Sequence, residues 1–428
     1  MAKVITTELQ HSGASAANIT LDSSKNVTCE NNLQVDGNVT VTGTLPADKL
    51  TGALPAISGA NLTGVTDTKP FRNLVINGAM QVAQRGTSST ASGYGTVDRF
   101  TTSYSGHDEA ITQAQESLTS SDTGPWALGF RKALKLTNGN QTSGAGATDS
   151  SQTLYKIEGQ DINHSGWNYT DPNSKITLSF WVKSSVAQTF YIRLRAYATA
   201  AQKQYISSFA LSANTWTKVT KTIPGHADLA GIASDNGNQF FIVWQHFYGT
   251  DYTGTQTENA WHTKDSSNNY PDMTTTWWTT NDATFHLTGV QLEAGDTATD
   301  FEHRSFGDEL ARCQRYYFME SGNDGDWMCT SMTQDSSDMY FFVNFPIPMR
   351  TLPSYTAEDK NVRHYGANPS DAFGAHGLAV SNQNTTSASG GGCTNTVLYK
   401  SGASITAGQA GVMQCQADGV KLQFSAEL

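Results

Sequence analysis

The leading part of the chain lacks the large apolar side chains from which a folded core is built. No aromatic residue occurs before Phe71. From Ile19 to Val41, apolar residues instead alternate with polar ones in short bursts between turn residues, which predicts very short strands. Such strands bury too little surface to fold alone. We therefore expect residues 1–70 to be stable only when several copies wrap around one another, and three chains about one axis is a simple closed solution.

The segment from Leu50 to Val65 continues this pattern, with aliphatic residues spaced among Gly, Ala and Pro. Gly and Pro disfavour a helix, and small residues disfavour a continuous sheet. We expect an extended stalk whose aliphatic side chains face partner chains, with a flexible tether as the alternative. The residues predicted for oligomer formation and attachment are Ile19, Leu21, Val27, Leu33, Val35, Val39, Val41, Leu50, Leu54, Ile57, Leu62 and Val65.

The composition of the whole chain favours strands joined by turns. Aromatic residues make up 10% of its 428 residues and charged residues only 15%, and a Thr-rich, aromatic-rich chain of low charge suits β structure. This length exceeds that of one ordinary domain. We predict an all-β protein with an intertwined N-terminal stalk (1–70), a central jelly-roll β-sandwich (71–305), a linking helix (306–318) and a small C-terminal β-sandwich (319–428).

Local patterns mark several individual elements. Asn73–Gln81 is predicted to be a strand followed by a turn. Lys175–Ser185 alternates apolar and polar residues, as a half-buried strand does. Ala283–Gly295 changes the parity of its apolar residues, which predicts a β-bulge at Gly289. Asp308–Phe318 lacks Gly and Pro and predicts the linking helix. The apolar residues assigned to inner strand faces include Ile176, Leu178, Phe180, Val182, Phe190, Ile192 and Leu194.

The charge and the remaining sequence signals exclude several partners. A net charge of −11 disfavours nucleic acid and anionic membranes, because like charges repel. The N-terminal residues contain no apolar signal-peptide core, and no long apolar run occurs, so we expect cytoplasmic synthesis without a membrane span. The five cysteines are scattered, which predicts free thiols rather than a zinc site.

The strongest functional signal is the density of aromatic and polar residues between Trp244 and Trp278. Aromatic rings cover the C–H faces of sugars, while Asn, Asp and His bind their hydroxyl groups. Residues 249–275 have a weak strand pattern and are predicted to form one long loop. The alternative is that the tryptophans pack the sandwich core. The glycan-binding candidates, with a second patch at residues 167–169, are Trp244, Tyr248, Tyr252, Trp261, His262, Asn268, Tyr270, Trp277, Trp278, Trp167 and Tyr169.

Catalytic motifs do not occur in the sequence. Neither GxSxG, HExxH nor a P-loop is present, and we predict that the chain is not an enzyme and needs no catalytic cofactor. A glycosidase would need two carboxylates beside a cleft. Candidates exist in polar segments, but solvated surface carboxylates are the simpler reading. They are Asp251, Glu258, Asp265 and Asp272.

Four stretches of the sequence resemble tail-fibre and related virion proteins of tailed bacteriophages, including those of marine cyanobacteria. The run QLEAG…FE…DEL…CQRYY within Val290–Phe318 is the most specific. The sequence departs from the family pattern at Ala83, where an aromatic residue usually precedes Gln-Arg-Gly. The other matching stretches are LTGALPAISGANLTGV at Leu50–Val65, NLVINGAMQVAQRGT at Asn73–Thr87 followed by Asp98-Arg99-Phe100, and FPIPMRTLPSY at Phe345–Tyr355 with the terminal FSAEL.

The resemblance implies a homotrimeric fibre that is assembled in a host cytoplasm and attached through its N-terminus to the tail or an adaptor protein of a virion. It implies a carbohydrate-binding-module-like jelly roll that recognises host surface polysaccharide or lipopolysaccharide. Jelly rolls of that kind often hold a structural calcium, for which Asp98, Asp296 and Asp300 are the candidate ligands. Two alternatives remain open at this point: an architectural fibre of the capsid or tail that binds no receptor, and a polysaccharide depolymerase.

Overall fold

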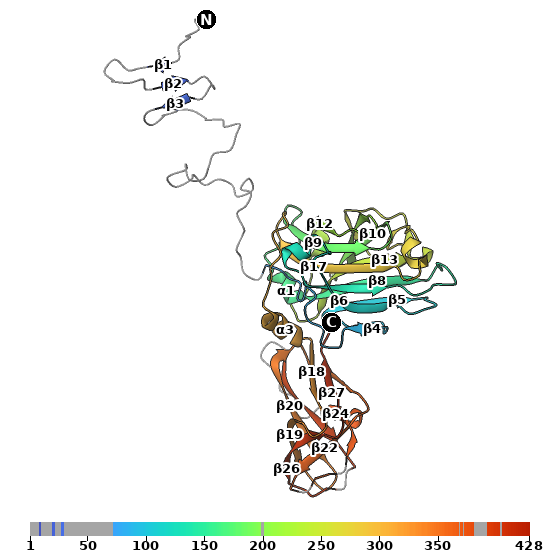
Figure 1. Ribbon diagram of the computed structural model, residues 1–428, viewed down its shortest axis with the longest axis vertical. Coiled ribbons are helices and arrows are strands. Elements are labelled where there is room, and N and C mark those ends of the chain that lie inside the picture. Colours follow the sequence, from blue (N-terminus) through green and yellow to red (C-terminus); the bar gives the residue numbers. More distant parts are fainter. Residues whose placement is uncertain are drawn as a thin grey trace. The chain divides into compact units, whose positions relative to one another are not determined.

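The chain divides into two compact units, Met1–Val65 and Thr66–Leu428, and a computed structural model shows both (Figure 1). In the first unit, only the backbone of three short antiparallel strands is described, and the second unit is described almost throughout. The described residues are 8–9, 19–21, 27–29, 72–197, 201–367, 369–370, 372–380, 392–402 and 405–428.

The three strands of the first unit form one small sheet in the order β1 (Glu8–Leu9), β2 (Ile19–Leu21) and β3 (Val27–Cys29). The very short strands predicted around Ile19 and Val27 are therefore confirmed. The predicted attachment residues from Leu33 to Val65 lie outside the described residues. The trimer remains a prediction.

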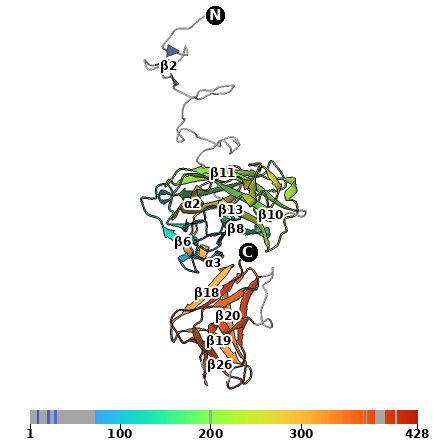
Figure 2. The ribbon, with the colours of Figure 1, turned by 90° about the vertical axis from the view of Figure 1, so that its right-hand side faces the viewer.

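Residues 72–305 form a β-sandwich of two six-stranded antiparallel sheets (Figures 1 and 2). The first sheet has the order β15 (Trp261–Thr263), β11 (Gln202–Leu211), β10 (Gln188–Tyr197), β13 (Asn238–Tyr248), β8 (Ser150–Glu158) and β5 (Phe100–Ser105). The second has the order β12 (Thr217–Pro224), β9 (Lys175–Ser184), β17 (Thr284–Ala294), β7 (Lys132–Thr137), β6 (Thr112–Ser117) and β4 (Ser88–Ser89). We call this module the central sandwich.

Alternation along the strands builds the core of the central sandwich, as the sequence predicts. All the inner-face residues predicted on β9 and β10 are completely buried, and the side chains between them point to the outer faces. The bulge predicted at Gly289 is also confirmed. The register of β17 against β9 shifts between Thr288 and Gln291, and Gly289 has a φ of 62°, a conformation that Gly adopts without a steric penalty.

Two predicted elements differ from the structure. Asn73–Gln81 is an irregular segment with a turn, not a strand. The linking helix exists, but α3 spans Phe306–Gln314 and ends before the predicted limit at Phe318. Tyr317 already belongs to β18, which pairs with β27 near the C-terminus, so tertiary pairing overrides the local helix propensity.

Residues 317–428 form a second, smaller β-sandwich, which we call the C-terminal sandwich. One sheet has the order β18 (Tyr317–Gly322), β27 (Val420–Ser425) and β21 (Ser354–Ala357). The other has the order β23 (Phe373–Gly374), β22 (Asn361–Gly366), β26 (Ala410–Cys415), β19 (Trp327–Thr333), β20 (Met339–Met349), β25 (Cys393–Lys400) and β24 (Ala379–Val380). The all-β class is confirmed.

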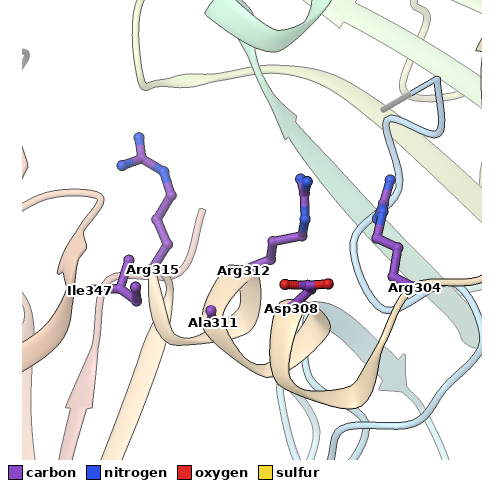
Figure 3. A pocket seen from close by; sticks show the side chains of 6 residues that line it. All are labelled: Arg304, Asp308, Ala311, Arg312, Arg315 and Ile347. Carbon is purple, nitrogen blue, oxygen red and sulfur yellow. The ribbon is translucent and has the colours of Figure 1, made fainter. Parts of the chain in front are cut away.

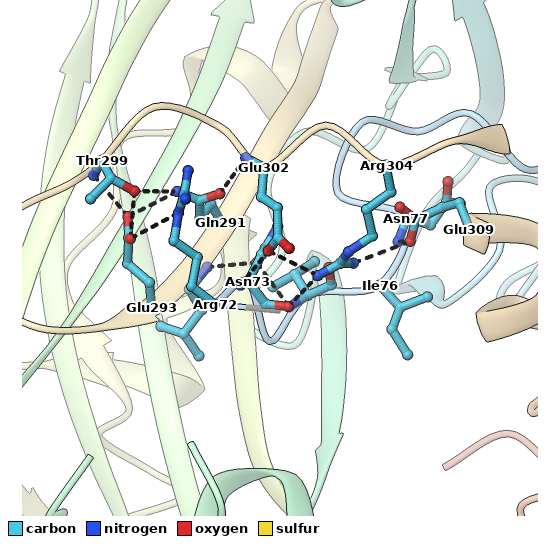
Figure 4. A network of polar contacts seen from close by, with 12 residues as sticks. Arg72, Asn73, Ile76, Asn77, Gln291, Glu293, Thr299, Glu302, Arg304 and Glu309 are labelled. Atoms are coloured by element: carbon cyan, nitrogen blue, oxygen red, sulfur yellow. Dashed lines mark hydrogen bonds and ion pairs between the residues drawn. The ribbon is translucent and has the colours of Figure 1, made fainter. Parts of the chain in front are cut away.

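A buried polar network ties the start of the central sandwich to its end (Figure 4). The Asn73 amide nitrogen donates to Val290 O at 3.1 Å, and Leu292 N donates to Asn73 Oδ1 at 3.1 Å. The backbone N–H of Asn73 donates to Glu302 Oε2 at 2.8 Å, and that of Asn77 to Glu309 Oε1 at 2.5 Å. Side-chain bonds thus replace the ladder that the predicted strand at Asn73 would have made, since buried backbone groups need partners.

Charged residues join the two sandwiches. Arg315 forms a bidentate pair with Glu158, with both distances at 2.9 Å, and Tyr316 Oη donates to the same carboxylate at 2.6 Å. Arg99, which is 1% exposed, pairs with Glu427 Oε2 at 2.5 Å. The stretches that resemble phage fibre proteins, around Arg99, Arg315 and the C-terminus, therefore supply contacts between the two sandwiches.

Four cysteines are free thiols, namely Cys313, Cys329, Cys393 and Cys415, as predicted for these positions. In the described part of the chain, no helix has the length and apolar character that crossing a membrane requires.

Candidate functional site

The aromatic residues predicted to bind glycan lie mostly inside the central sandwich. Trp244, Trp277, Trp278 and Tyr270 are completely buried, and Trp261 donates its indole N–H to Pro224 O at 2.7 Å while remaining 9% exposed. A ring that is covered on both faces offers no surface to a sugar. The prediction of a glycan platform is therefore corrected for these five residues: they pack the protein, as the alternative reading held.

The second predicted patch is also structural. Trp167 is 3% exposed and contacts Phe240 edge-on, with ring centroids 6.0 Å apart. The neighbouring Tyr169 is half-buried and donates its hydroxyl to Asn163 Oδ1 at 2.9 Å. These contacts hold the loop before β9 against the core.

Four of the predicted residues between Trp244 and Trp278 keep partial exposure. The rings of Tyr248 and Tyr252 stack with centroids 4.5 Å apart. His262 lies 3.0 Å from the side-chain nitrogen of Gln204, and burial lowers the pKa of this histidine. Asn268 is half-buried. The structure thus gathers no open row of rings from the predicted set.

Residues 249–275 are not the single irregular loop that we predicted. β15 adds to the edge of β11, and β14 (Thr253–Gly254) pairs in parallel with β16 (Tyr270–Pro271). The segment covers part of the outer face of the first sheet, because Tyr270 packs with Tyr191 and Ile206. Its aromatic residues therefore seal a second, small apolar cluster rather than facing solvent.

Three of the four candidate catalytic carboxylates make local structural contacts. Glu258 Oε2 accepts from Ser208 N at 2.8 Å, and Asp272 Oδ1 accepts from the Thr253 hydroxyl at 2.9 Å. Hydrogen bonds from Ser267 lower the pKa of Asp265, which is opposite to the raised pKa that a glycosidase acid needs. Asp251 is exposed.

The calcium candidates do not converge on a site. Asp98 is 1% exposed and accepts from the backbone and side-chain nitrogens of Gln84 at 3.0 and 2.5 Å, so its oxygens already have protein donors. Asp296 and Asp300 are exposed. Within the described ranges, no three His, Cys, Asp or Glu side chains are grouped as a metal ion requires.

A pocket of about 460 Å³ lies beside α3 (Figure 3) and is lined by Arg304, Asp308, Ala311, Arg312, Arg315 and Ile347. Its arginines are already engaged. Arg304 donates to Asn73 O at 2.6 Å and pairs with Glu302 at 3.3 Å, and Arg315 pairs with Glu158. Arg304 thus holds the start of the central sandwich and Arg315 holds the joint between the sandwiches, and we assign the pocket no ligand.

The most exposed aromatic surface among the described residues lies on the C-terminal sandwich. Trp327 is 66% exposed and Tyr365 is 40% exposed. Their rings stack with centroids 6.4 Å apart and an interplanar angle of 27°. Because the two exposed rings lie together rather than singly, we treat them as a candidate interaction site.

Strand pairing brings this surface together. β26 pairs with β19 on one side and β22 on the other, so that Trp327, Gln414 and Arg363 occupy one cross-strand row. The inward neighbours Val362 and Met413 are completely buried, which forces the alternating residues outward.

Polar groups flank the exposed rings. The Arg363 guanidinium lies 5.1 Å from the centroid of the Tyr365 ring and donates to Gln414 Oε1 at 3.0 and 2.8 Å. We call Trp327, Arg363, Tyr365 and Gln414 the Trp327 surface. It combines exposed ring faces with hydrogen-bonding groups, the combination that sugar recognition needs.

Sequence reasoning missed the Trp327 surface because its two rings are 38 positions apart and come from strands that do not pair with each other. The alternation of β22 around Val362 contained the only available signal, since it places Arg363 and Tyr365 on the outer face.

No protein-family model matches the chain, and a search of curated proteins finds no match. Among solved structures, the enzymatically active domain of bacteriophage CBA120 tailspike protein 4 is similar at a TM-score of 0.28 and 10% identity, over 53% of this chain and 22% of that chain. The chain thus matches about a fifth of the tailspike's length.

Two binding domains are similar to about half of this chain. The family 11 carbohydrate-binding module of a Clostridium thermocellum cellulosomal cellulase has a TM-score of 0.24 and 12% identity, over 51% of this chain and 98% of that chain. The N-terminal cellulose-binding domain of Cellulomonas fimi β-1,4-glucanase C has a TM-score of 0.23 and 12% identity, over 51% and 99%. The central module is defined as a sandwich by its own two sheets and their shared core, not by these similarities.

Proposed function

We propose that this chain is a non-enzymatic, glycan-binding structural protein of a phage virion, a tail fibre that recognises host surface polysaccharide or lipopolysaccharide. The observation that carries the binding role is the stacked, solvent-exposed pair Trp327 and Tyr365 on a rigid sheet. The proposed virion role rests on the resemblance of the sequence to phage fibre proteins.

The Trp327 surface suits a sugar better than a second protein surface of general apolar character. Its rings present flat faces that cover pyranose C–H groups, and the Arg363 and Gln414 side chains lie at their rim to bind hydroxyl groups. Both sides of the surface are held by the β26 ladder. The site is therefore preorganised, which reduces the entropy cost of binding.

Alanine substitution of Trp327 tests this assignment. On an array of bacterial capsular polysaccharides and lipopolysaccharides, the full chain is expected to bind at least one glycan, and W327A to bind it about tenfold more weakly, because a stacking ring contributes on the order of 1 kcal/mol beyond its buried area. The melting temperature should change little, since the ring is mostly in water.

Phe306, which is 56% exposed on α3, provides the matched control. F306A removes an exposed aromatic ring outside the Trp327 surface and should leave glycan binding unchanged. If the double variant W327A/Y365A binds the array as the original chain does, the glycan assignment is wrong and an architectural role without receptor binding becomes the better explanation.

The fibre part of the proposal includes three copies of the chain, N-terminal attachment to the tail or an adaptor, and assembly in the host cytoplasm. It is supported by the shortage of large apolar residues before Phe71, which leaves the leading segment without its own core. Light scattering should give the mass of three chains. A stable monomer would contradict the fibre but not the glycan assignment.

A further inference from the structure

Two arginines occupy successive outer positions of β10 in the central sandwich. Arg193 and Arg195 alternate with Ile192 and Leu194, which are completely buried in the core, so both guanidinium groups lie over the outer face of the first sheet. Two residues of a strand span about 7 Å. The two positive charges are therefore neighbours on one face.

The described residues supply no carboxylate to either arginine. Arg193 is 2% exposed, and the groups to which its Nη1 donates are uncharged amide oxygens, at 2.9 Å in Asn269 and 3.5 Å in Gln204. Neither guanidinium forms an ion pair in the part of the chain that the structure describes, and the Nε atoms of both lack hydrogen-bond partners there. Buried charges are normally paired, because leaving water is costly for them.

A third cation strengthens the positive field. Burial and then repulsion by Arg193 and Arg195 lower the pKa of Lys264, and burial and then repulsion by Arg193 lower the pKa of Arg195. The backbone of Lys264 is fixed by its N–H, which donates to Gln202 O at 2.8 Å. Three cations thus influence one another here, with the exposed Asp265 beside Lys264 as the opposing charge, in a chain whose net charge is −11.

Aromatic rings surround these cations. The Arg195 guanidinium lies 4.0 Å from the centroid of Phe241 and 5.6 Å from that of Tyr197. Arg193 lies 4.9 Å from the centroid of Tyr270. The rings hold the guanidinium groups in place without neutralising their charge. Arg195 and Tyr197 are only partly buried, so a ligand can approach the face at these two residues.

We propose that this cationic face, formed by Arg193, Arg195, Tyr197, Phe241 and Lys264, binds an acidic saccharide through its carboxylate or sulfate groups. Arg195 contacts the anion, because a guanidinium fork matches a carboxylate or sulfate in a bidentate pair. Arg193 lies deeper and supplies charge. The acidic surface of the chain disfavours nucleic acid, whose closely spaced phosphates need many more cations.

This site is separate from the Trp327 surface and does not depend on it. The probes are sodium polygalacturonate, which carries carboxylates, carrageenan, which carries sulfates, and neutral dextran, each cast into a native gel. The full chain should be retarded by at least one acidic polymer and not by dextran. R195Q should weaken this binding about tenfold or more, because a charge-assisted bidentate contact is lost.

Control variants separate the possible explanations. K218Q removes an exposed lysine from β12 in the other sheet and should bind the polymers as the original chain does. R195K keeps a positive charge but loses the guanidinium fork, so its binding should be weaker than that of the original chain and stronger than that of R195Q. K264Q, which carries no risk to the core, should also weaken binding. W327A should leave retardation by acidic polymers unchanged, which distinguishes this site from the Trp327 surface.

The results either support or overturn the proposal. The proposal is supported if polygalacturonate or carrageenan retards the chain and if both R195Q and K264Q weaken this retardation. The polymer that binds then identifies the anionic group. The proposal fails if no acidic polymer retards the chain, if dextran retards it equally, or if neither substitution matters. Stronger binding of a single-stranded DNA oligonucleotide than of both acidic polymers would also overturn it.

Discussion

Acid is expected to remove the contribution of one buried histidine to the stability of the central sandwich. His246 lies at an irregularity of β13, where the register against β8 shifts between Gln245 and Phe247, and its ring faces the core. The two ring nitrogens lie 3.0 Å from Ser151 Oγ and 3.4 Å from Thr153 Oγ1. No carboxylate is among its partners in the described residues, and burial lowers the pKa of His246 from 6.5 to about 3.

The sign and size of the effect follow from proton linkage. Because the folded state resists protonation, the unfolded state takes up the proton as the pH falls below 6.5. The contribution of His246 is therefore intact above pH 6.5 and is lost progressively down to about pH 3. Each pKa unit corresponds to about 1.4 kcal/mol, so a change from pH 6.5 to 4.5 should remove about 2–3 kcal/mol from the contribution that His246 alone makes to the free energy of unfolding.

The variant H246Q isolates this contribution, since Gln forms hydrogen bonds but does not titrate. Urea unfolding followed by tryptophan fluorescence reports mainly on the central sandwich, because only Trp327 of the nine tryptophans lies outside it. The stability advantage of the original chain over H246Q should shrink by about 1.4 kcal/mol per pH unit below pH 6.5.

The pH dependence that other titrating groups contribute to stability should be the same in the original chain and in H246Q, and so should cancel in their difference. Burial raises the pKa of both Asp98 and Asp161 to about 6, so these carboxyl groups favour the folded state at low pH in both proteins. If the free energies of unfolding of the original chain and of H246Q change with pH in parallel between pH 6.5 and 4.5, the reasoning is refuted. The folded state would then accept a proton at His246.

Two further substitutions test the structure. E427Q should lower the free energy of unfolding by about 3 kcal/mol in urea titrations, because it leaves the buried Arg99 without its ionic partner. The control E358Q removes the partner of Lys421 in an exposed pair and should cost less than about 1 kcal/mol. Equal losses in the two variants would contradict a buried joint. G289A should lower the free energy of unfolding by about 2–4 kcal/mol, since φ is positive there and a Cβ would lie 2.7 Å from the Phe130 side chain. The control G408A has a φ of 74° but no atom near the added Cβ, and should lower it by only about 1 kcal/mol. Equal losses would show that the contact with Phe130 has no effect.

The sequence predicts the strands of the central sandwich well because their alternation is a local property. Ile176 and its partners on β9 reveal the buried face without knowledge of the fold. Gly289 signals its bulge in the same way, through a change of parity within one strand. The motif-like run around Arg315 is visible too, but its contact with Glu158 joins residues 157 positions apart, so its structural role emerges only in three dimensions.

The candidate sites are poorly predictable for the same physical reason. A cluster of aromatic residues in sequence suits both a core and a binding platform, and the choice depends on what covers each ring. Tyr270 is hidden because its own segment folds over Tyr191 and Ile206. Trp327 is exposed although it is the only aromatic residue of β19, and its partner Tyr365 comes from another strand. Arg193 gives no sequence signal, because its lack of a carboxylate is a property of space.

The proposed trimer would strengthen binding at the proposed sites. The Trp327 surface offers only two rings and one guanidinium group, and contacts of this kind contribute on the order of 1 kcal/mol each, so a single copy should bind sugar weakly. Three copies on one fibre would turn the second and third contacts with a repetitive polysaccharide into intramolecular events, which raises the overall affinity by orders of magnitude without any new contact. The segment before Phe71, which we predict to fold only with its copies, would then contribute to recognition by holding the copies together. Weak single sites also allow rebinding along a polymer, whereas one tight site would fix the particle at its first contact.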